Sequence, residues 1–218
     1  MAEKNLLGTY PKIKRDYDKR MAEKTPEVVR IAKMFGKDFF DGERKYGYGG
    51  YKYDGRWKSV VARMKEHYSL PDNAAILDIG CGKGFMLHDF KELMPNCTIA
   101  GIDVSEYAIG NAMPDMKPFI KVASAEKLPY PDKSFDLVVS INSIHNLPPE
   151  KLKTALEEVE RISRGNSYVT MDAWHNDQEK DNLYKWVLTA ETMMHVDDWG
   201  KLFAEIGYTG DYWWFIAD

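Results

Sequence analysis

The chain has 218 residues, of which 44% are hydrophobic and 29% are charged, and its formal net charge is −4 at pH 7. This length predicts one domain of ordinary size with a small appendage, and the apolar fraction is enough for a continuous core. A mildly acidic balance gives no general attraction to a phosphate backbone. We therefore expect no nucleic acid as the main partner.

The apolar runs of the chain are short, and LVVSI at residues 137–141 is typical of them. None is long enough to span a bilayer, and residues 1–20 lack the apolar stretch of a secretory signal. Cys81 and Cys97 imply no disulfide framework. These observations predict a cytoplasmic protein without a membrane partner, as a monomer or a homodimer.

The N-terminal part of the chain predicts two helices separated by a loop rich in tyrosine and glycine. Thr25 can cap a helix over residues 25–35, and apolar side chains on one face predict a second helix over 56–68. Between them, residues 42–57 carry four tyrosines and five glycines. The alternating tyrosines fit a strand with one buried face, whereas the glycines favour a binding loop.

From residue 75 the pattern changes to alternating strands and helices. Strands are predicted at residues 74–80, 97–104, 119–123, 134–141, 167–174 and 211–217. Helices are predicted between them at residues 84–94, 106–112, 148–162, 179–190 and 196–208. This alternation predicts an α/β protein with a Rossmann-like, doubly wound and mostly parallel sheet. Residues 71–218 then form the sheet domain, and residues 1–70 form an N-terminal helical arm and lid.

The strongest local signal is ILDIGCGKGFM at residues 76–86. A buried strand leads directly into Gly80, Gly82 and Gly84, and a helix begins at once. Glycines in such a turn let backbone N–H groups approach a ligand, although a tight turn without a ligand would also need them. The next strand ends in Asp103, 23 positions after Gly80, where an acid can accept both ribose hydroxyls of a nucleoside.

The spacing of these glycines distinguishes between nucleoside ligands. A dinucleotide-binding fold has the pattern G-x-G-x-x-G, but here the third glycine falls one residue early and position 85 is Phe. Asp78, two residues before the first glycine, is a further departure from the dinucleotide pattern.

Four motifs follow one another along the sheet domain: LDIGCGKG, GIDVS, ASAEKLPYPDKSFDLVVS and INSIHNL. In these motifs the chain resembles the class I S-adenosylmethionine-dependent methyltransferases, in the branch with small type 11-like domains. The resemblance covers about residues 74–171 and, more loosely, residues 197–207. It implies a sheet that finishes with a hairpin of two strands. Because eleven residues follow Gly207, we expect six strands, or seven with an abbreviated hairpin.

The resemblance implies which residues hold the family's cofactor, S-adenosyl-L-methionine. Asp78 and the loop with Gly80, Gly82 and Gly84 are expected at its methionine part. Asp103 is expected at its ribose.

The remaining cofactor contacts that the resemblance implies involve the adenine and the methyl group. Val104 is expected beside the adenine, and Ala125 and Glu126 at its edge. The family commonly has Asp where this chain has Ser124, which is a departure at the adenine edge. Ser140 is expected where the fourth strand opens towards the methyl group.

Methyl transfer from a sulfonium needs little covalent help, because alignment of the nucleophile, methyl carbon and sulfur supplies much of the rate. A base matters only where the acceptor must lose a proton. His145 follows the fourth strand, at the edge where open α/β sheets bind ligands, and is either this base or a residue that packs against the cofactor. Asp172 and His175 follow the fifth strand at the same rim and either reach the substrate or belong to the loop. No spacing matches a metal site, so none is predicted.

Residues 42–57 precede the first strand, and in this fold such a segment commonly lies across the carboxyl edge of the sheet. We expect a lid there, with tyrosines such as Tyr46 as its wall and glycines at its bends. Tyrosine faces suit a cationic acceptor, whereas Arg44 and Arg56 suit a carboxylate or phosphate. The alternative is a structural apron in which the tyrosines pack and the arginines lie in solvent.

The sequence therefore predicts methyl transfer to a nitrogen or oxygen of a small polar metabolite. Two alternatives stay open. One is a methyltransferase that acts on protein or RNA, and the other is a non-catalytic subunit that binds S-adenosylmethionine.

Overall fold

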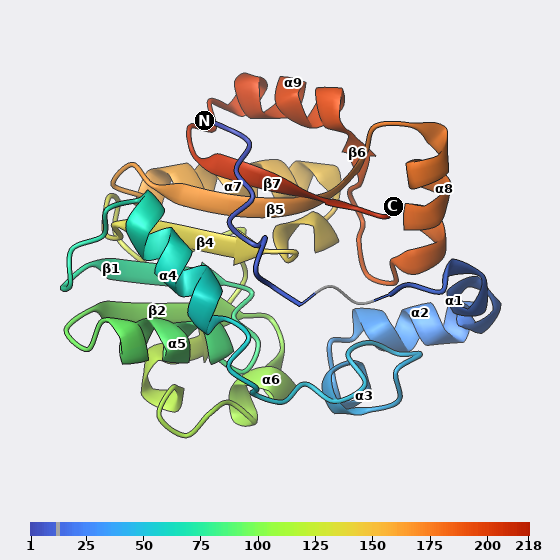
Figure 1. Ribbon diagram of the computed structural model, residues 1–218, viewed down its shortest axis with the longest axis horizontal. Coiled ribbons are helices and arrows are strands. Elements are labelled where there is room, and N and C mark those ends of the chain that lie inside the picture. The colour runs from blue at the N-terminus through green and yellow to red at the C-terminus, as the bar shows by residue number, and fades with distance from the viewer. Residues whose placement is uncertain (12–13) are drawn as a thin grey trace.

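A computed structural model describes residues 1–11 and 14–218 (Figure 1). Its strands are β1 (Ala75–Ile79), β2 (Thr98–Asp103), β3 (Ile120–Val122), β4 (Leu137–Ile141), β5 (Ser167–Trp174), β6 (Met194–His195) and β7 (Asp211–Ile216). Its α-helices are α1 (Tyr17–Glu23), α2 (Pro26–Lys33), α3 (Lys37–Asp41), α4 (Lys58–His67), α5 (Phe85–Leu93), α6 (Glu106–Gly110), α7 (Pro149–Ile162), α8 (Asp177–Trp186) and α9 (Val196–Ile206). Two short 3-10 helices are η1 (Lys117–Phe119) and η2 (Ile144–Asn146).

The strands form one seven-stranded sheet in which every pairing is parallel. The order is β3-β2-β1-β4-β5, and β7 lies along β5. The strand order reverses between β1 and β4, so the loops after these two strands diverge at the carboxyl edge, where such sheets bind ligands. The predicted fold class is confirmed.

The last two strands differ from the hairpin that the family resemblance implies. β6 has two residues, and Ala173 of β5 pairs with Met194 on one side and Ile216 on the other. The 11-residue helix α9 stands between β6 and β7 and returns the chain to the opposite edge, so β7 enters the sheet parallel to β5. The expectation of a terminal hairpin was therefore wrong for the described residues, whereas a sheet of seven strands was among the alternatives.

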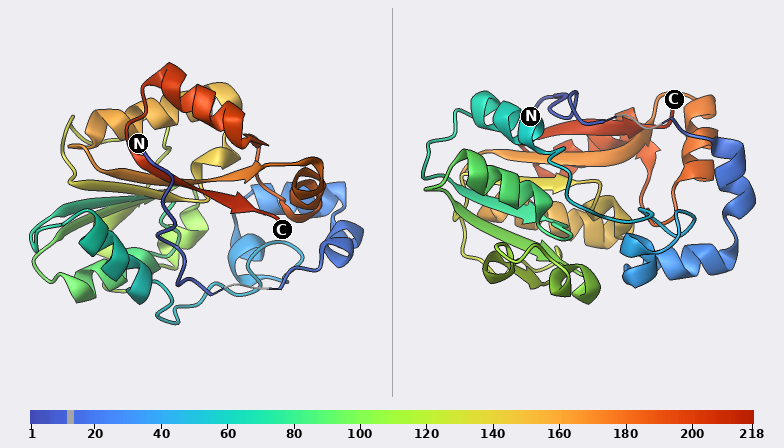
Figure 2. Two further views of the ribbon diagram at one scale, coloured as in Figure 1. Left: turned by 45° about the horizontal axis from the view of Figure 1, so that its top comes forward. Right: turned by 60° about the horizontal axis from the view of Figure 1, so that its bottom comes forward.

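Two apolar clusters cover the two faces of the sheet, beneath the helices that flank it in Figure 2. Alternate residues of β1 supply them, because successive side chains of a strand point to opposite faces: Ile76 packs with α4 and α5, and Leu77 packs with α7 and α9. The sheet is thus the middle of three layers.

The N-terminal segment contacts the sheet in two places. Lys4 N donates to Tyr212 O over 2.8 Å, which adds a short stretch of chain beside β7, and Leu6 is buried in the cluster with α4 and α5. Helices α1 to α3 then lie with α8 on the side of the molecule to which the strands point (Figure 1).

Capping residues mark three helix ends, and one of them is the predicted cap Thr25. Thr25 Oγ1 accepts from Val28 N at the start of α2, and Ser105 Oγ accepts from Ala108 N at the start of α6. Gly207, in the left-handed conformation, ends α9. Within residues 1–11 and 14–218, no helix has both the length and the apolar composition needed to cross a membrane.

Candidate functional site

The glycine loop after β1 packs against the segment that follows β4. Gly80 has a φ of +81°, and a side chain there would collide with Ser143 Oγ. Gly80 N and Cys81 N both donate to Ile102 O of β2, over 2.8 and 3.0 Å. A glycine at position 80 therefore allows the carboxyl ends of β1, β2 and β4 to converge.

Asp103, at the end of β2, is held against this loop. Its two carboxylate oxygens accept from Gly82 N and from Ser105 N, each over 2.8 Å. Burial raises the pKa of Asp103, and these backbone hydrogen bonds oppose the increase. The acid that the sequence places 23 positions after Gly80 thus lies beside the glycine loop.

Asp78 is a buried acid one strand away from Asp103. Burial, with a smaller contribution from the charge of Asp103, raises the pKa of Asp78 to about 8. Two carboxyl groups at one edge that disfavour each other's ionisation suit a ligand that brings positive charge.

This raised pKa predicts a pH effect on stability. An Asp in an unfolded chain has a pKa of about 3.9, so between about pH 4 and pH 8 the folded protein keeps the Asp78 proton while the unfolded chain loses it. The contribution of Asp78 to stability is therefore present at low pH and is lost as the pH rises. The measured quantity is the free energy of unfolding of Asp78→Asn minus that of wild type. This difference should be roughly 1–3 kcal/mol larger near pH 8 than near pH 5. Thermal melts of the ligand-free protein across this range measure the difference. Asp115→Asn, at an exposed acid, is the control. A difference between Asp78→Asn and wild type that stays constant with pH would contradict the assignment.

His145 lies in η2, directly after β4, and is buried beside a second buried group. Its Nε2 is 3.5 Å from Asp172 Oδ2, at the carboxyl end of β5. Burial raises the pKa of Asp172, and the nearby His145 and Arg15 oppose that increase. His145 Nδ1 and Ser140 Oγ are both buried without a hydrogen-bond partner among the described residues. Buried polar atoms without partners are uncommon, and they mark β4 as a place where a ligand atom is expected.

The segment before α4 is fastened to the glycine loop through Asp41. Its carboxylate accepts from Lys83 Nζ over 2.7 and 2.8 Å, from Tyr107 Oη over 2.7 Å and from Tyr51 N over 3.1 Å. These hydrogen bonds lower the pKa of Asp41, against the effect of its burial. Ser105 Oγ also donates to Phe35 O over 2.5 Å. Helix α3 and its neighbours are thereby attached to the loops that follow β1 and β2.

Aromatic side chains line this attachment. Tyr51 stacks on Phe85 at 4.7 Å, and a side chain on Gly82 would lie 3.1 Å from the Tyr51 ring. The Tyr48 ring is 4.4 Å from that of Tyr51. Tyr48 is 49% exposed, yet burial by surrounding protein raises its pKa above the usual value. Tyr48 thus leaves part of its surface open to solvent beside Tyr51.

Residues 76–166, which include the glycine loop, Asp103 and His145, match the family model described as a methyltransferase domain. A structure of an S-adenosylmethionine-dependent methyltransferase from Archaeoglobus fulgidus superposes with a TM-score of 0.52 at 21% identity, over 69% of this chain and 68% of that one. Residues 76–166 are therefore a methyltransferase domain, with the fold of an S-adenosylmethionine-dependent methyltransferase.

Relatives of this methyltransferase domain have different substrates in their names. A tRNA (carboxymethyluridine(34)-5-O)-methyltransferase of Arabidopsis thaliana is 34% identical over 146 residues, 66% of this chain and 34% of the relative. Sterol 4-C-methyltransferase strm-1 of Caenorhabditis elegans is 30% identical over 159 residues, 70% of this chain and 46% of the relative. The chain thus spans less than half the length of these two relatives, and their names do not agree on an acceptor.

The residues of the methyltransferase domain fit the family's cofactor, S-adenosylmethionine. The glycine loop offers backbone close to the Asp103 carboxylate, and Val104, after β2, is 54% exposed at the predicted adenine position. Ala125 is buried in the loop after β3. Glu126 lies beside it and accepts from Ser124 Oγ over 3.2 Å, so the Ser124 hydroxyl makes a hydrogen bond within its own loop.

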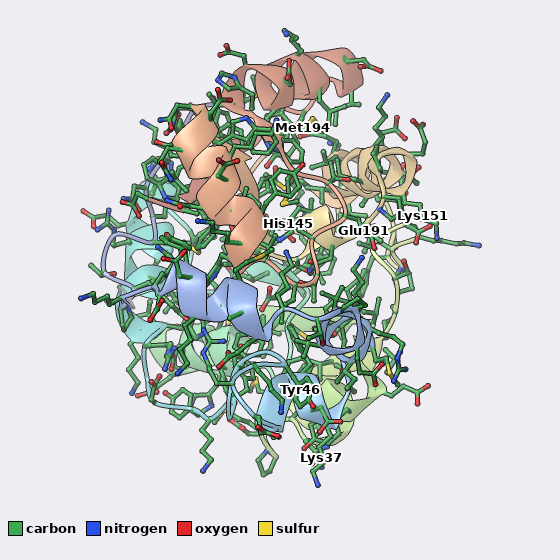
Figure 3. All side chains as sticks on the ribbon, turned by 90° about the vertical axis from the view of Figure 1, so that its right-hand side faces the viewer. Lys37, Tyr46, His145, Lys151, Glu191 and Met194 are labelled. Carbon is green, nitrogen blue, oxygen red and sulfur yellow. The ribbon has the colours of Figure 1, made fainter. Side chains whose placement is uncertain are left out.

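The structure does not bring the other predicted acceptor residues to His145. Tyr46 packs against Val28, Ala32 and Leu188, and it lies apart from His145 on the face shown in Figure 3. Arg44 donates to Gly47 O and lies over the Trp186 ring, whereas Arg56 pairs with Asp54. Tyr46 and Arg56 therefore have local partners of the kind that the apron alternative expects.

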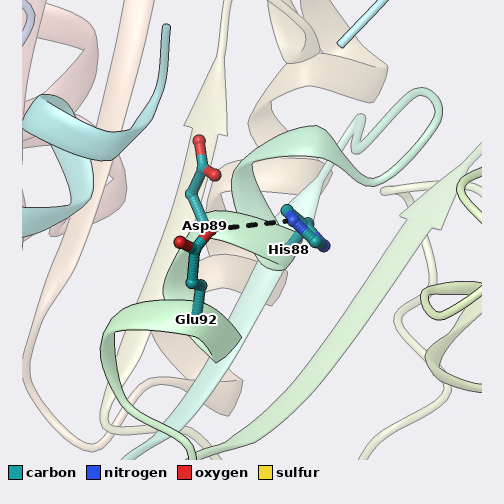
Figure 4. A group of neighbouring side chains, drawn as sticks. All are labelled: His88, Asp89 and Glu92. Atoms are coloured by element: carbon teal, nitrogen blue, oxygen red, sulfur yellow. Dashed lines mark ion pairs between the residues drawn. The ribbon is translucent and has the colours of Figure 1, made fainter. Parts of the chain in front are cut away.

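One group of side chains has the composition of a metal site. His88, Asp89 and Glu92 of α5 offer ligand atoms within 4.8 Å of one another (Figure 4). Each has a protein partner: His88 Nδ1 pairs with Asp115, Asp89 Oδ1 accepts from Tyr53 Oη, and Glu92 pairs with Lys58. These contacts engage all three side chains, but Asp89 Oδ2 is buried without a hydrogen-bond partner among the described residues.

Proposed function

We propose that this protein transfers a methyl group from S-adenosylmethionine to a nitrogen or oxygen of a small polar metabolite. The observation that carries the proposal is that His145 Nδ1 and Ser140 Oγ are buried without partners, on either side of Ser143, which packs against Gly80 of the glycine loop. Bound cofactor would supply an activated methyl group, and Asp103, Asp78 and the glycine loop would hold it. Ala125, Glu126 and Val104 would surround its adenine.

His145 is the proposed general base. An Asp172 carboxylate near Nε2 favours the tautomer with a proton on Nε2, which leaves the lone pair of Nδ1 to accept the acceptor's proton. Burial of both groups excludes water that would otherwise compete for that proton. Asp172 is then a positioning residue that acts through His145.

The proposed acceptor site lies beneath residues 36–57. Asp41 fastens this segment to Lys83 of the glycine loop, and Tyr48, which is half exposed, lies beside Tyr51 in the same segment. Opening of this segment would break the Asp41–Lys83 ion pair and the Tyr51–Phe85 contact, so we expect bound cofactor and acceptor to favour the closed position.

A second acceptor class has one observation in its favour. The Arabidopsis relative's name specifies a carboxymethyluridine of tRNA, and it is 34% identical to this chain over 146 residues. The net charge of −4 argues against RNA, because a protein that holds a nucleic acid backbone generally gathers an excess of lysine and arginine.

Incubation of the whole chain with methyl-labelled S-adenosylmethionine and fractionated cell extract tests the proposal. Label in the small-molecule fraction supports it. Label in RNA or protein favours the second class of acceptor. No transfer, under conditions in which calorimetry shows cofactor binding, would indicate a non-catalytic binding subunit and contradict the proposed function.

The attachment of the lid gives a prediction of its own. Asp41→Asn leaves the buried Lys83 without its counter-charge, so limited proteolysis within residues 36–57 should be about fivefold faster or more, as expected for a charged contact of roughly 1–2 kcal/mol. Asp54→Asn, an exposed acid in the same segment that pairs with Arg56, should cleave at nearly the wild-type rate. Equal cleavage of Asp41→Asn and wild type would show that Asp41 does not hold the segment.

A further inference from the structure

Three arginines surround one tryptophan at the carboxyl edge of the sheet. The guanidinium carbons of Arg15, Arg20 and Arg44 lie 5.7, 5.5 and 5.6 Å from the centre of the Trp186 ring. Arg15 and Arg20 belong to the start of the chain, Arg44 to the lid, and Trp186 ends α8. Segments far apart in the sequence therefore bring three positive charges to one place.

These charges have little compensation among the described residues. The one carboxylate within 4.0 Å of the three guanidinium groups is Asp218, 3.6 Å from Arg15, and its side chain is 79% exposed. An ion pair with such an exposed partner is weak. Within 4.0 Å, the three guanidinium groups therefore have one exposed counter-charge, and from farther away the charge of Glu23 opposes the lowering of the Arg20 pKa.

Arg20 has a structural role in the cluster. It donates to the carbonyl oxygens of Trp186, Arg44 and Lys45, over 3.1, 3.3 and 3.0 Å, and it is buried. Burial and the charge of Arg44 lower the pKa of Arg20. Arg44, by contrast, is exposed and donates to Gly47 O alone among the described residues, and Arg15 forms no hydrogen bond there. Arg15 and Arg44 retain donors for a ligand.

The cluster extends from the end of β5 to the tyrosines before α4. On one side, the guanidinium carbon of Arg15 lies 4.5 Å from the centre of the Phe215 ring, and Phe215 pairs with Asp172, the partner of His145, in the register of β7 and β5. On the other side, Arg44 donates to Gly47 O, and a side chain on Gly49 would lie 3.0 Å from Arg44 Cδ, so Arg44 lies against both residues that flank Tyr48. These contacts connect the two arginines to both sides of the space that the proposed acceptor would enter.

We propose that Arg15 and Arg44, stacked on Trp186 and supported by Arg20, bind an anionic group of the methyl acceptor, a carboxylate or a phosphate. This inference rests on the proposed function and narrows its substrate class. Guanidinium groups offer paired N–H donors that match the oxygens of either anion, and a bound anion also relieves the mutual repulsion of the arginines. A cationic acceptor would meet that repulsion, so the tyrosines of the lid do not select a cation here.

Calorimetric titration of the whole chain, saturated with S-adenosylhomocysteine, tests the cluster with inorganic phosphate and malonate as probes. Wild type should bind at least one of them, and the stronger probe indicates phosphate or carboxylate as the preferred group. Arg15→Gln/Arg44→Gln should weaken that binding about tenfold or more, since each arginine supplies charge-assisted hydrogen bonds. Arg164→Gln, which removes the same charge beside Asp136, just before the amino end of β4, should bind as wild type does.

If the double variant does not melt cooperatively, the single variants serve instead. Arg15→Gln alone and Arg44→Gln alone should each weaken probe binding about threefold. Absence of binding of both probes to wild type, or equal binding to the variants, would overturn the inference. The labelled small-molecule product should also be retained on an anion-exchange resin, and an unretained product would overturn it as well. These results would overturn only the anion site, and the proposed function would stand as long as methyl transfer occurs. Wild type that binds a probe but does not bind S-adenosylhomocysteine would contradict the proposed function instead.

Discussion

His145→Gln is expected to lower kcat by about 10²–10⁴-fold while the Kd for S-adenosylmethionine stays nearly unchanged. Glutamine keeps much of the volume of the imidazole but cannot accept the acceptor's proton at Nδ1. Because His145 is buried beside Asp172, the lost step would not be replaced by solvent. Single-turnover methyl transfer and calorimetric cofactor titration of the same preparation measure the two quantities.

Two comparison variants separate a base from a packing residue. His175→Gln changes an exposed histidine near the same rim that pairs with Glu179, and it should keep wild-type turnover. Asp172→Asn should lower kcat less than His145→Gln and shift its pH profile, because the imidazole loses the carboxylate that orients it. If His145 only packs, turnover and cofactor affinity should fall together and modestly. A His145→Gln enzyme with wild-type turnover and an unaltered pH profile would rule out the base.

The sheet could be predicted from the sequence because its signals are local. Apolar runs of strand length, the caps Thr25 and Ser105, and the glycine loop each depend on residues close together in the chain. The direction of β7, at the end of the sheet, could not be predicted from the sequence, because it is decided by where α9 docks. That docking depends on the Trp199 and Phe203 rings packing on Trp214, a contact between separate elements.

The residues of the candidate site also fall into two groups, those that the sequence could predict and those that depend on contacts between distant segments. Asp103 and His145 follow strands, so the parallel order of the sheet places them at one edge, and the same reasoning extends to Asp172. Asp41 carried no signal of its own, because its partner Lys83 lies 42 positions away and meets it only after the segment before β1 folds over the glycine loop. The Arg15–Trp186 contact is equally non-local.

The tyrosines between residues 42 and 57 do not act as one set. Tyr51 packs on Phe85 beside the glycine loop and Tyr48 contacts Tyr51, so these two would form the wall of the proposed lid. Tyr53 Oη donates to Asp89 of α5, and Tyr46 packs on α2, so these two hold the segment in place. The alternating pattern therefore combines a wall and its anchors, which explains why neither a simple strand nor a simple loop described it.

Asp103→Ala is expected to weaken S-adenosylmethionine binding by roughly 1.5–3 kcal/mol, or about 10–150-fold in Kd, the range for hydrogen bonds to a charged group. The carboxylate already accepts from Gly82 N and Ser105 N, so its removal also loosens the glycine loop that would cradle the methionine part. Asp103→Asn keeps one carbonyl oxygen as an acceptor and should lose less affinity than Asp103→Ala. Asp115→Ala, at an exposed acid that pairs with His88, should bind cofactor as wild type does. Calorimetric titration of variants with cooperative melts measures the effect. An Asp103→Ala protein that folds and binds with unchanged affinity would remove Asp103 from the cofactor site and leave the ribose without its proposed acceptor.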